Sequence, residues 1–130
     1  MICKFNETLP AEYQALAEGC GQKVSAKSAT RALQNSIFTV GIYDEGALVA
    51  FGRICGDGVL CFMVCDIMVD DRYRQEQLER QVMQEITEYL REVTTRESCV
   101  TIHVSAEYGP LCRQYGYRYL DEDCEVVMRK

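Results

Sequence analysis

The chain has 130 residues, of which 48% are hydrophobic and 26% are charged, a composition typical of a folded globular protein. This length is sufficient for one buried core, so we expect residues 1–130 to form a single domain. The formal net charge of −6 argues against a nucleic acid or an anionic membrane surface as a partner, because both attract basic proteins. No apolar run is long enough to span a membrane, and the N-terminus lacks the apolar stretch of a signal peptide. These features predict a cytoplasmic protein.

Eight cysteines are scattered singly along the chain, and none forms a Cys-x-x-Cys pair. Cys61 and Cys65 share one face of a predicted strand, which is a poor geometry for a metal pair that has no further ligands. The chain also contains only one histidine, so a zinc site is not expected. We therefore interpret the cysteines as buried, reduced thiols that act as small apolar residues.

The N-terminal half predicts a short edge strand, two helices and a meander of strands. Apolar positions alternate over residues 2–5, which predicts an edge strand. Apolar spacing then predicts helices near residues 9–20 and 25–35, with Pro10 in a first turn and Ser25 as an N-cap. Glycine-containing turns separate the three apolar runs that follow, which is typical of antiparallel hairpins. These runs are residues 37–43, 47–55 and 59–69.

The periodicity then changes to that of a helix. One apolar stripe over residues 78–93 predicts a helix of about twenty residues, counted from the loop that opens it. A β-branched strand follows at residues 99–104, and a strand–helix–strand order implies a parallel pair. Residues 110–115 predict a short helix that is stopped by Gly116. Residues 117–120 and 124–129 predict a closing hairpin. The fold class is therefore α/β (α+β), with one mixed, largely antiparallel sheet and helices on both of its faces.

Four segments resemble, in the right order, the GNAT N-acetyltransferase superfamily. Residues 46–54, followed by the turn at residues 57–58, resemble the family's G-x-L-V-G-F-G-R strand pair. Residues 66–74 resemble D-x-x-V-x-P-x-Y-(Q/R), and residues 80–83 resemble (K/R)-x-L-M. Residues 111–117 resemble the late F-Y-E-K-x-G-F. The likeness covers residues 37–130 and, more weakly, the N-terminal helices.

The resemblance implies an enzyme that transfers acetyl from acetyl-CoA to an amine. In this family acetyl-CoA lies where the central strand and its parallel neighbour splay apart, and its pantetheine pairs with the backbone of the central strand. Its pyrophosphate lies at the start of the long helix, where free N–H groups and the helix dipole favour an anion. The implied coenzyme-binding residues are Ile67, Met68, Val69, Arg74, Gln75, Glu76, Gln77, Leu78, Glu79 and Arg80.

The predicted pyrophosphate loop departs from the family pattern (Q/R)-x-x-G-x-(G/A), in which small residues let the ligand approach bare backbone. Gln77 and Glu79 stand at the two small positions. A carboxylate about 5 Å from a ligand charge repels it by about 3 kcal/mol before screening. Arg72, Arg74 and Arg80 could offset this repulsion if they point inward. Alternatively, the acidic residues only complement the positive helix end.

The candidate catalytic residues are Asp66, Cys112 and Tyr115. Cys112 stands where the family carries the tyrosine that protonates the coenzyme thiolate, and a thiol has a suitable ordinary pKa of about 8.5. A small buried helix residue is the alternative interpretation of Cys112. Tyr115 and Tyr108 lie nearby in sequence and could supply the proton instead.

Asp66 alternates with apolar neighbours on the predicted central strand, so its carboxylate points to one face of the sheet. It is a candidate base, or alternatively a hydrogen-bonded strand aspartate. Histidine is a common general base, but His103 sits on a strand, where a lone histidine is commonly structural. Glu107 and Asp57 are weaker candidates.

The sequence therefore predicts an acetyl-CoA-dependent N-acetyltransferase that acts on a small amine or a protein amine. The alternative is a catalytically impaired GNAT-like domain that binds an acyl-CoA or a protein, because both the loop glycines and the late tyrosine are replaced. The negative charge favours a cationic acceptor. The final hairpin and its strand edge predict a homodimer, since an exposed apolar edge is commonly covered.

Overall fold

A computed structural model describes all 130 residues. Its five strands form one mixed sheet in the order β1-β2-β3-β4-β5, antiparallel except for the β4–β5 pair. The strands are β1 (Ile2–Phe5), β2 (Phe38–Asp44), β3 (Ala47–Gly56), β4 (Cys61–Val69) and β5 (Cys99–Ile102). The helices are α1 (Pro10–Gly19), α2 (Ala26–Gln34), α3 (Leu78–Val93) and α4 (Gly109–Gln114), with 3₁₀-helices η1 (Asp71–Glu76) and η2 (Ala106–Tyr108). None of the helices combines the length and the apolar composition that a membrane span requires.

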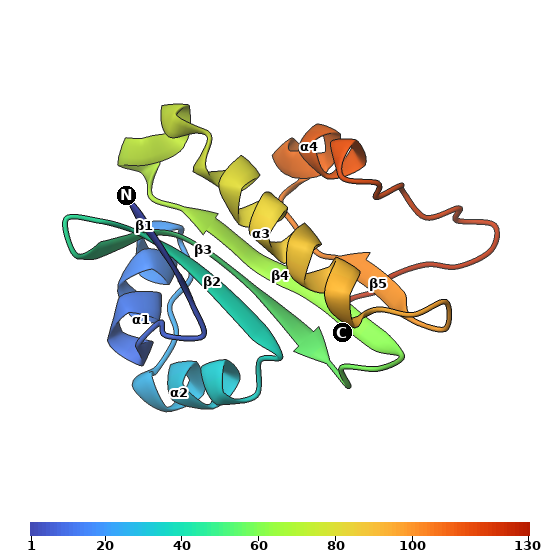
Figure 1. Cartoon of the computed structure of the whole chain (residues 1–130), viewed down its shortest axis with the longest axis horizontal. Coiled ribbons are helices and arrows are strands. Elements are labelled where there is room, and N and C mark those ends of the chain that lie inside the picture. Colours follow the sequence, from blue (N-terminus) through green and yellow to red (C-terminus); the bar gives the residue numbers. More distant parts are fainter.

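Helices cover both faces of the sheet, as the sequence predicted (Figure 1). Helix α3 lies on one face and buries the larger apolar cluster, which includes Phe62, Val64, Val82 and Ile86. Helices α1 and α2 cover the other face with a smaller cluster around Phe51. Along β4, Phe62 and Val64 face α3, whereas Met68 faces α1, because the register of β4 against β3 shifts by one residue between them.

Gly52 lets α3 approach the sheet closely. A Cβ atom at this position would lie 2.6 Å from Val82 Cγ1 and 2.9 Å from the Cδ1 atoms of Ile67 and Ile86. Helix α3 therefore crosses β3 where β3 has no side chain on that face. This contact fixes the start of α3 relative to β4, which carries the candidate site.

The closing hairpin predicted at residues 117–120 and 124–129 does not form, so that prediction was wrong. The only regular feature beyond Gly116 is a turn in which Cys124 and Glu125 donate their N–H groups to the carbonyl of Asp121. A hairpin is stable in water only if it buries one face against another element. Here Val126, Val127 and Met128 are all exposed, so neither face of such a hairpin would be covered within one copy of the chain.

The interpretation of the cysteines as buried thiols was also wrong for most of them. All eight are free, but only Cys65 and Cys112 are buried and Cys55 is half-buried. The other five are exposed, because they lie on the short edge strands, at the first residue of β4, at a helix end or in the C-terminal segment. These exposed cysteines are Cys3, Cys20, Cys61, Cys99 and Cys124.

Candidate active site

Strands β4 and β5 separate in the middle of the sheet. They pair in parallel from Cys61 with Cys99 to Val64 with Ile102. His103 donates one further N–H to the carbonyl of Val64, at 2.9 Å. Strand β4 then continues to Val69, whereas β5 ends at Ile102. From Cys65 to Val69, the edge of β4 on the side of β5 therefore has no strand beside it and can pair with a ligand, while the other edge stays paired with β3.

A β-bulge at Asp66 bends β4 at this separation. The register between β3 and β4 shifts between Phe51 and Arg53, and Asp66 has a left-handed backbone with φ of 54°. Aspartate tolerates this conformation better than most residues do. Bulges re-aim the backbone beside them, so the unpaired part of β4 turns away from the line of the paired part.

Two donors hold the Asp66 carboxylate in place. Arg53 Nε lies 2.6 Å from Asp66 Oδ2, and the hydroxyl of Tyr13 donates to the same oxygen at 2.8 Å. Burial and the hydrogen bond to Asp66 raise the pKa of Tyr13, so its hydroxyl stays protonated and continues to donate. Asp66 is thus a hydrogen-bonded strand aspartate, which was one of the two interpretations of this residue from the sequence. Its Oδ1 atom accepts no hydrogen bond from another side chain.

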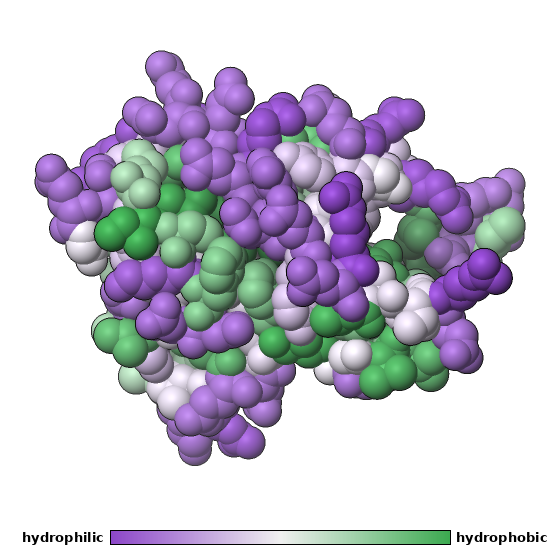
Figure 2. All heavy atoms as spheres, viewed as in Figure 1, coloured by the Kyte–Doolittle hydropathy of each residue, from purple (hydrophilic) through white to green (hydrophobic).

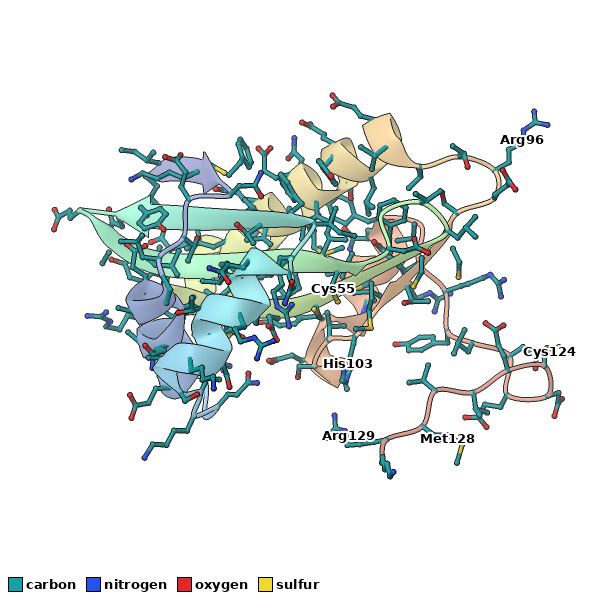
Figure 3. All side chains as sticks on the ribbon, turned by 90° about the horizontal axis from the view of Figure 1, so that it is seen from below. Cys55, Arg96, His103, Cys124, Met128 and Arg129 are labelled. Atoms are coloured by element: carbon teal, nitrogen blue, oxygen red, sulfur yellow. The ribbon has the colours of Figure 1, made fainter.

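A cleft of about 710 Å³ opens beside the unpaired edge of β4. Its walls come from β4, from the end of α1, from the chain after β5 and from the loop before α3. The His103 side chain and Arg129 of the C-terminal segment lie on the same side of the sheet (Figure 3). The cleft is lined by Gly19, Cys20, Gln22, Cys65, Asp66, Ile67, Met68, Val69, Asp71, Arg74, His103, Val104, Ser105, Glu107, Tyr108 and Arg129.

The loop before α3 contains a left-handed residue at the position where the resemblance expects a glycine. Gln77 has φ of 55° and ψ of 37°, directly before Leu78 begins the helix. The left-handed conformation is costly for a residue with a Cβ atom. The chain therefore keeps the backbone shape that a glycine would give, and adds a side chain to it. Leu78 itself is buried in the core, so only its N–H group remains available at the helix start.

The three arginines of this region each have a partner in the protein. Arg72 binds Asp70 at 2.9 Å, and Arg80 Nη1 donates to Gln114 at 2.9 Å. Arg74 Nε lies 2.7 Å from Asp71, and Arg74 Nη1 lies 4.0 Å from Glu107. Of the three, Arg74 alone lines the cleft. Among these three arginines, an anion in the cleft would therefore meet only Arg74, whose guanidinium two carboxylates already share.

The two candidate acids from the sequence lie outside this cleft. Cys112 is buried in α4. The hydroxyl of Tyr115 donates to the carbonyl of Arg80 at 3.2 Å, on the outside of α3. Tyr108, by contrast, lines the cleft. Burial, followed by the charges of Glu107 and Glu79, raises the pKa of Tyr108.

The remaining candidate bases divide between the cleft and a distant turn. His103 and Glu107 line the cleft. Asp57 holds the turn between β3 and β4, where its Oδ1 accepts the N–H groups of Val59, Leu60 and Cys61 at 2.8–2.9 Å. Those bonds, first that from Cys61, lower the pKa of Asp57. Asp57 is therefore a turn residue and does not reach the cleft.

Several cleft residues were missed from the sequence because they arrive through tertiary packing. The end of α1 brings Cys20 to β4, where its thiol lies 3.7 Å from the carbonyl of Val69. Ser105 and Arg129 also line the cleft. Local periodicity cannot place a helix end beside a strand that lies about fifty residues away. The glycines that end α1 mark only that the chain turns there.

The comparisons with known proteins agree with this architecture. Residues 8–127 match the acetyltransferase (GNAT) domain family. A search among curated proteins found no match. A probable acetyltransferase of unknown function from meticillin-resistant Staphylococcus aureus is similar in structure, with a TM-score of 0.87, 25% identity and 99% of each chain covered.

More distant solved structures share the fold. A GNAT family acetyltransferase from Streptococcus pneumoniae has a TM-score of 0.79 at 19% identity, covering 99% of this chain and 96% of its own. Glucosamine-6-phosphate N-acetyltransferase from Arabidopsis thaliana has a TM-score of 0.67 at 17% identity, covering 100% and 98%. Since the family match spans nearly the whole chain, this protein belongs to the GNAT acetyltransferase family.

Proposed function

We propose that the protein transfers an acetyl group from acetyl-CoA to a primary amine, on a small molecule or on a protein, as one domain formed by residues 1–130. The observation that carries this proposal is the unpaired edge of β4 beside the cleft. Free backbone N–H and C=O groups at a strand edge bind an extended ligand as another strand would. Pantetheine is such a ligand, since it carries two amides in a thin chain.

The residues present fit acetyl-CoA at the strand and fit it less well at the loop. The backbone of Ile67, Met68 and Val69 lies along the cleft and would pair with the pantetheine amides. Arg74 and the N–H groups at the start of α3 would hold the pyrophosphate. Residues 75–77, Glu79 and Arg80 would surround it, with Leu78 contributing backbone alone. Binding of the phosphates would have to displace Asp71 or Glu107 from Arg74, which predicts a weakened affinity.

The side chains that line the cleft supply candidates for each proton transfer. We assign the base to His103, because it lines the cleft and its ring has no hydrogen-bond partner in the protein. We assign the acid that protonates the thiolate to Tyr108. A backbone N–H of β4 would stabilise the tetrahedral oxyanion. Asp66 holds the bulge that aims this backbone, through its contacts with Arg53 and Tyr13.

The charges around the cleft favour a cationic acceptor. Three carboxylates and two guanidiniums line the cleft, and the whole chain carries a net charge of −6. An ammonium group is attracted to such a surface and delivered faster at low salt. Polyamines, aminoglycosides and lysine side chains all have this chemistry. The cytoplasmic location stays a prediction from the sequence.

A second candidate function is that of a binding domain for an acyl-CoA or a protein, without turnover. It is favoured by the side chains of Gln77 and Glu79 in the loop and by the positions of Cys112 and Tyr115 outside the cleft. The unpaired strand edge would still bind a pantetheine chain in that case. The two functions therefore differ in turnover and not in binding.

Two assays test these proposals together. Thermal unfolding with acetyl-CoA, CoA or no ligand measures binding, and ligand at about a hundred times its dissociation constant stabilises by about 2.7 kcal/mol. Release of free thiol with a panel of cationic amines measures turnover. Binding with amine-dependent thiol release supports the enzyme. Binding without release for any amine supports the acyl-CoA-binding domain. The absence of binding contradicts both the enzyme and the acyl-CoA-binding domain.

A further inference from the structure

Two thiols meet on the face of the sheet that carries α1 and α2. Arg53 of β3 is the register partner of Cys65 in β4, and Cys55 is the register partner of Met63. Because side chains alternate along a strand, Cys55 and Cys65 lie on the same face as diagonal neighbours. Their Sγ atoms are 3.8 Å apart, and both thiols are free. The two sulfur atoms are therefore already in contact across the strand pair.

The two thiols differ in their access to solvent. Cys65 is buried, whereas Cys55 is half-buried one residue before the end of β3. Figure 3 shows Cys55 on the side of the sheet away from α3, the same side as His103. Hydrophilic side chains cover much of α3 on the opposite face (Figure 2). A small reagent therefore reaches the pair from the face opposite α3, and it meets Cys55 first.

Cys65 is also part of the wall of the cleft beside β4. It directly follows Val64, the last residue of β4 that pairs with β5, and directly precedes Asp66 in the bulge. A covalent bond from Cys65 to Cys55 would fasten this wall to β3 beside the bulge. The chemical state of the two thiols therefore affects the cleft, whichever ligand the cleft binds.

We propose that Cys55 and Cys65 are a redox-active dithiol, which a low-molecular-weight disulfide oxidises to a disulfide between β3 and β4. The Cys55 thiolate attacks one sulfur of the small disulfide, whose S–S bond breaks, and one small thiol leaves with a proton. Cys65 then loses its proton and attacks the Cys55 sulfur, which releases the second small thiol. Two protein thiols are oxidised and one small disulfide is reduced to two thiols, so electrons and protons balance.

The geometry requires only a short approach of the two sulfur atoms. A disulfide bond is about 2.05 Å long, so the atoms must approach by about 1.8 Å from their distance of 3.8 Å. The new bond would close only the hairpin between the two residues, which joins neighbouring strands of the sheet. The strand order therefore does not change on oxidation.

The surroundings of the pair set the order of the two steps. Burial raises the pKa of Cys65, which makes it a poor first nucleophile because the thiolate is the reacting form. The positive charge of Arg53 opposes this shift of the pKa and assists Cys65 in the second step. A thiol held in contact with its target also acts at a high effective concentration. Cys55 therefore reacts first, and Cys65 resolves the mixed disulfide.

The test incubates the reduced full chain with excess oxidised glutathione, blocks the remaining thiols and maps disulfides by peptide mass spectrometry. Trypsin leaves Cys55, Cys61 and Cys65 in one peptide, so the digest uses chymotrypsin, which cleaves between them. Cys61 and Cys99 are the competing pair, because they are register partners and both exposed. We expect the Cys55–Cys65 disulfide to be at least about ten times as abundant as Cys61–Cys99, since its sulfur atoms are already in contact.

Three serine variants separate the roles of the thiols. In Cys65→Ser, Cys55 should stop at a mixed disulfide with glutathione, because the resolving thiol is absent. In Cys55→Ser, the buried Cys65 should form a mixed disulfide at least about tenfold more slowly than Cys55 does in Cys65→Ser. Cys61→Ser is the matched control and should still form the Cys55–Cys65 disulfide. An equal rate for the two mixed disulfides would overturn the proposed order of steps.

Hydrogen exchange of the unmodified protein, before and after oxidation, is a second measurement and decides the matter if a serine variant does not fold. We expect slower exchange in residues 53–56 and 62–66 after oxidation, because a cross-link opposes local opening of the strands. Neither measurement involves acetyl-CoA, so failure of the proposed function would leave these results unchanged. The proposal is overturned if Cys55 and Cys65 stay free, if Cys61–Cys99 forms in preference, or if exchange in these residues does not slow.

Discussion

Arg53 Nε lies 2.6 Å from Asp66 Oδ2 and joins β3 to β4 at the β-bulge of β4. Both side chains are largely shielded, with 20% and 17% of their surface exposed. The pair joins β3 to the part of β4 that lines the cleft. It therefore links the stability of the sheet to the shape of the candidate site.

Removing one partner should destabilise the protein and disturb the site. We expect Arg53→Met to lower the free energy of unfolding by about 2–3 kcal/mol, because it leaves the Asp66 carboxylate half-buried with Tyr13 as its one partner. Asp66→Asn should cost less. Urea unfolding of both variants and of the double variant gives the coupling energy. Additive effects would show that the two side chains do not act together.

Asp66→Asn also distinguishes a base from a positioning residue. If Asp66 holds the bulge while His103 takes the proton, the asparagine variant should keep the pH dependence of kcat/KM with a reduced rate. His103→Gln should remove the limb of the profile that belongs to the base. Loss of that limb in Asp66→Asn, with His103→Gln unaffected, would reverse the assignment.

Gly52→Ala tests the packing of α3 on the sheet. Its Cβ would lie 2.6 Å from Val82 Cγ1, so we expect a loss of about 1–3 kcal/mol in urea unfolding. Gly19→Ala is the control, because nothing lies within 4 Å of its added Cβ. An equal effect of the two changes would contradict the close crossing of α3 and β3.

Gln77→Gly tests the left-handed residue before α3. Because glycine adopts positive φ without strain, the variant should gain about 1 kcal/mol of stability. It should also bind acetyl-CoA more tightly, because bare backbone would face the pyrophosphate. Gln75→Gly in η1 is the matched control and should destabilise. A Gln77→Gly variant of unchanged stability and affinity would count against both arguments.

Tyr108→Phe and Tyr115→Phe form a matched pair for the acid. Tyr108 lines the cleft, whereas the Tyr115 hydroxyl binds the carbonyl of Arg80. We expect Tyr108→Phe to lower kcat by about a hundredfold or more and Tyr115→Phe to leave it nearly unchanged. Since burial raises the pKa of Tyr108, its hydroxyl loses its proton only above the ordinary tyrosine pKa of about 10. The alkaline fall in rate should therefore lie above that pH. The opposite ranking would restore Tyr115 as the candidate.

Much of the fold was predictable because its elements are locally encoded. Glycine-containing turns after Asp44 and Gly56 predicted the meander, and the apolar stripe from Leu78 to Leu90 predicted α3. The parallel pair followed from the order of strand, helix and strand. The closing hairpin was wrong because residues 117–129 alternate well enough to form strands, yet no neighbouring strand within one copy receives them.

The site was predictable along one strand and obscure elsewhere. Residues 66–69 lie on the predicted central strand and line the cleft, and their roles toward the coenzyme stay predictions. The roles of Tyr13 and Arg53 depend on contacts with Asp66 over 53 and 13 residues, which no local pattern encodes. Tyr108 ends η2 and Tyr115 directly follows α4, so their hydroxyls could not be placed from sequence.

Hydrogen exchange with and without acetyl-CoA tests the central claim, that the cleft beside β4 binds the coenzyme. We predict slower exchange in residues 65–69 and at the start of α3, residues 77–80, with little change in the turn at residues 57–60. Protection confined to other parts of the chain, or no protection at acetyl-CoA concentrations that saturate related enzymes, would contradict it.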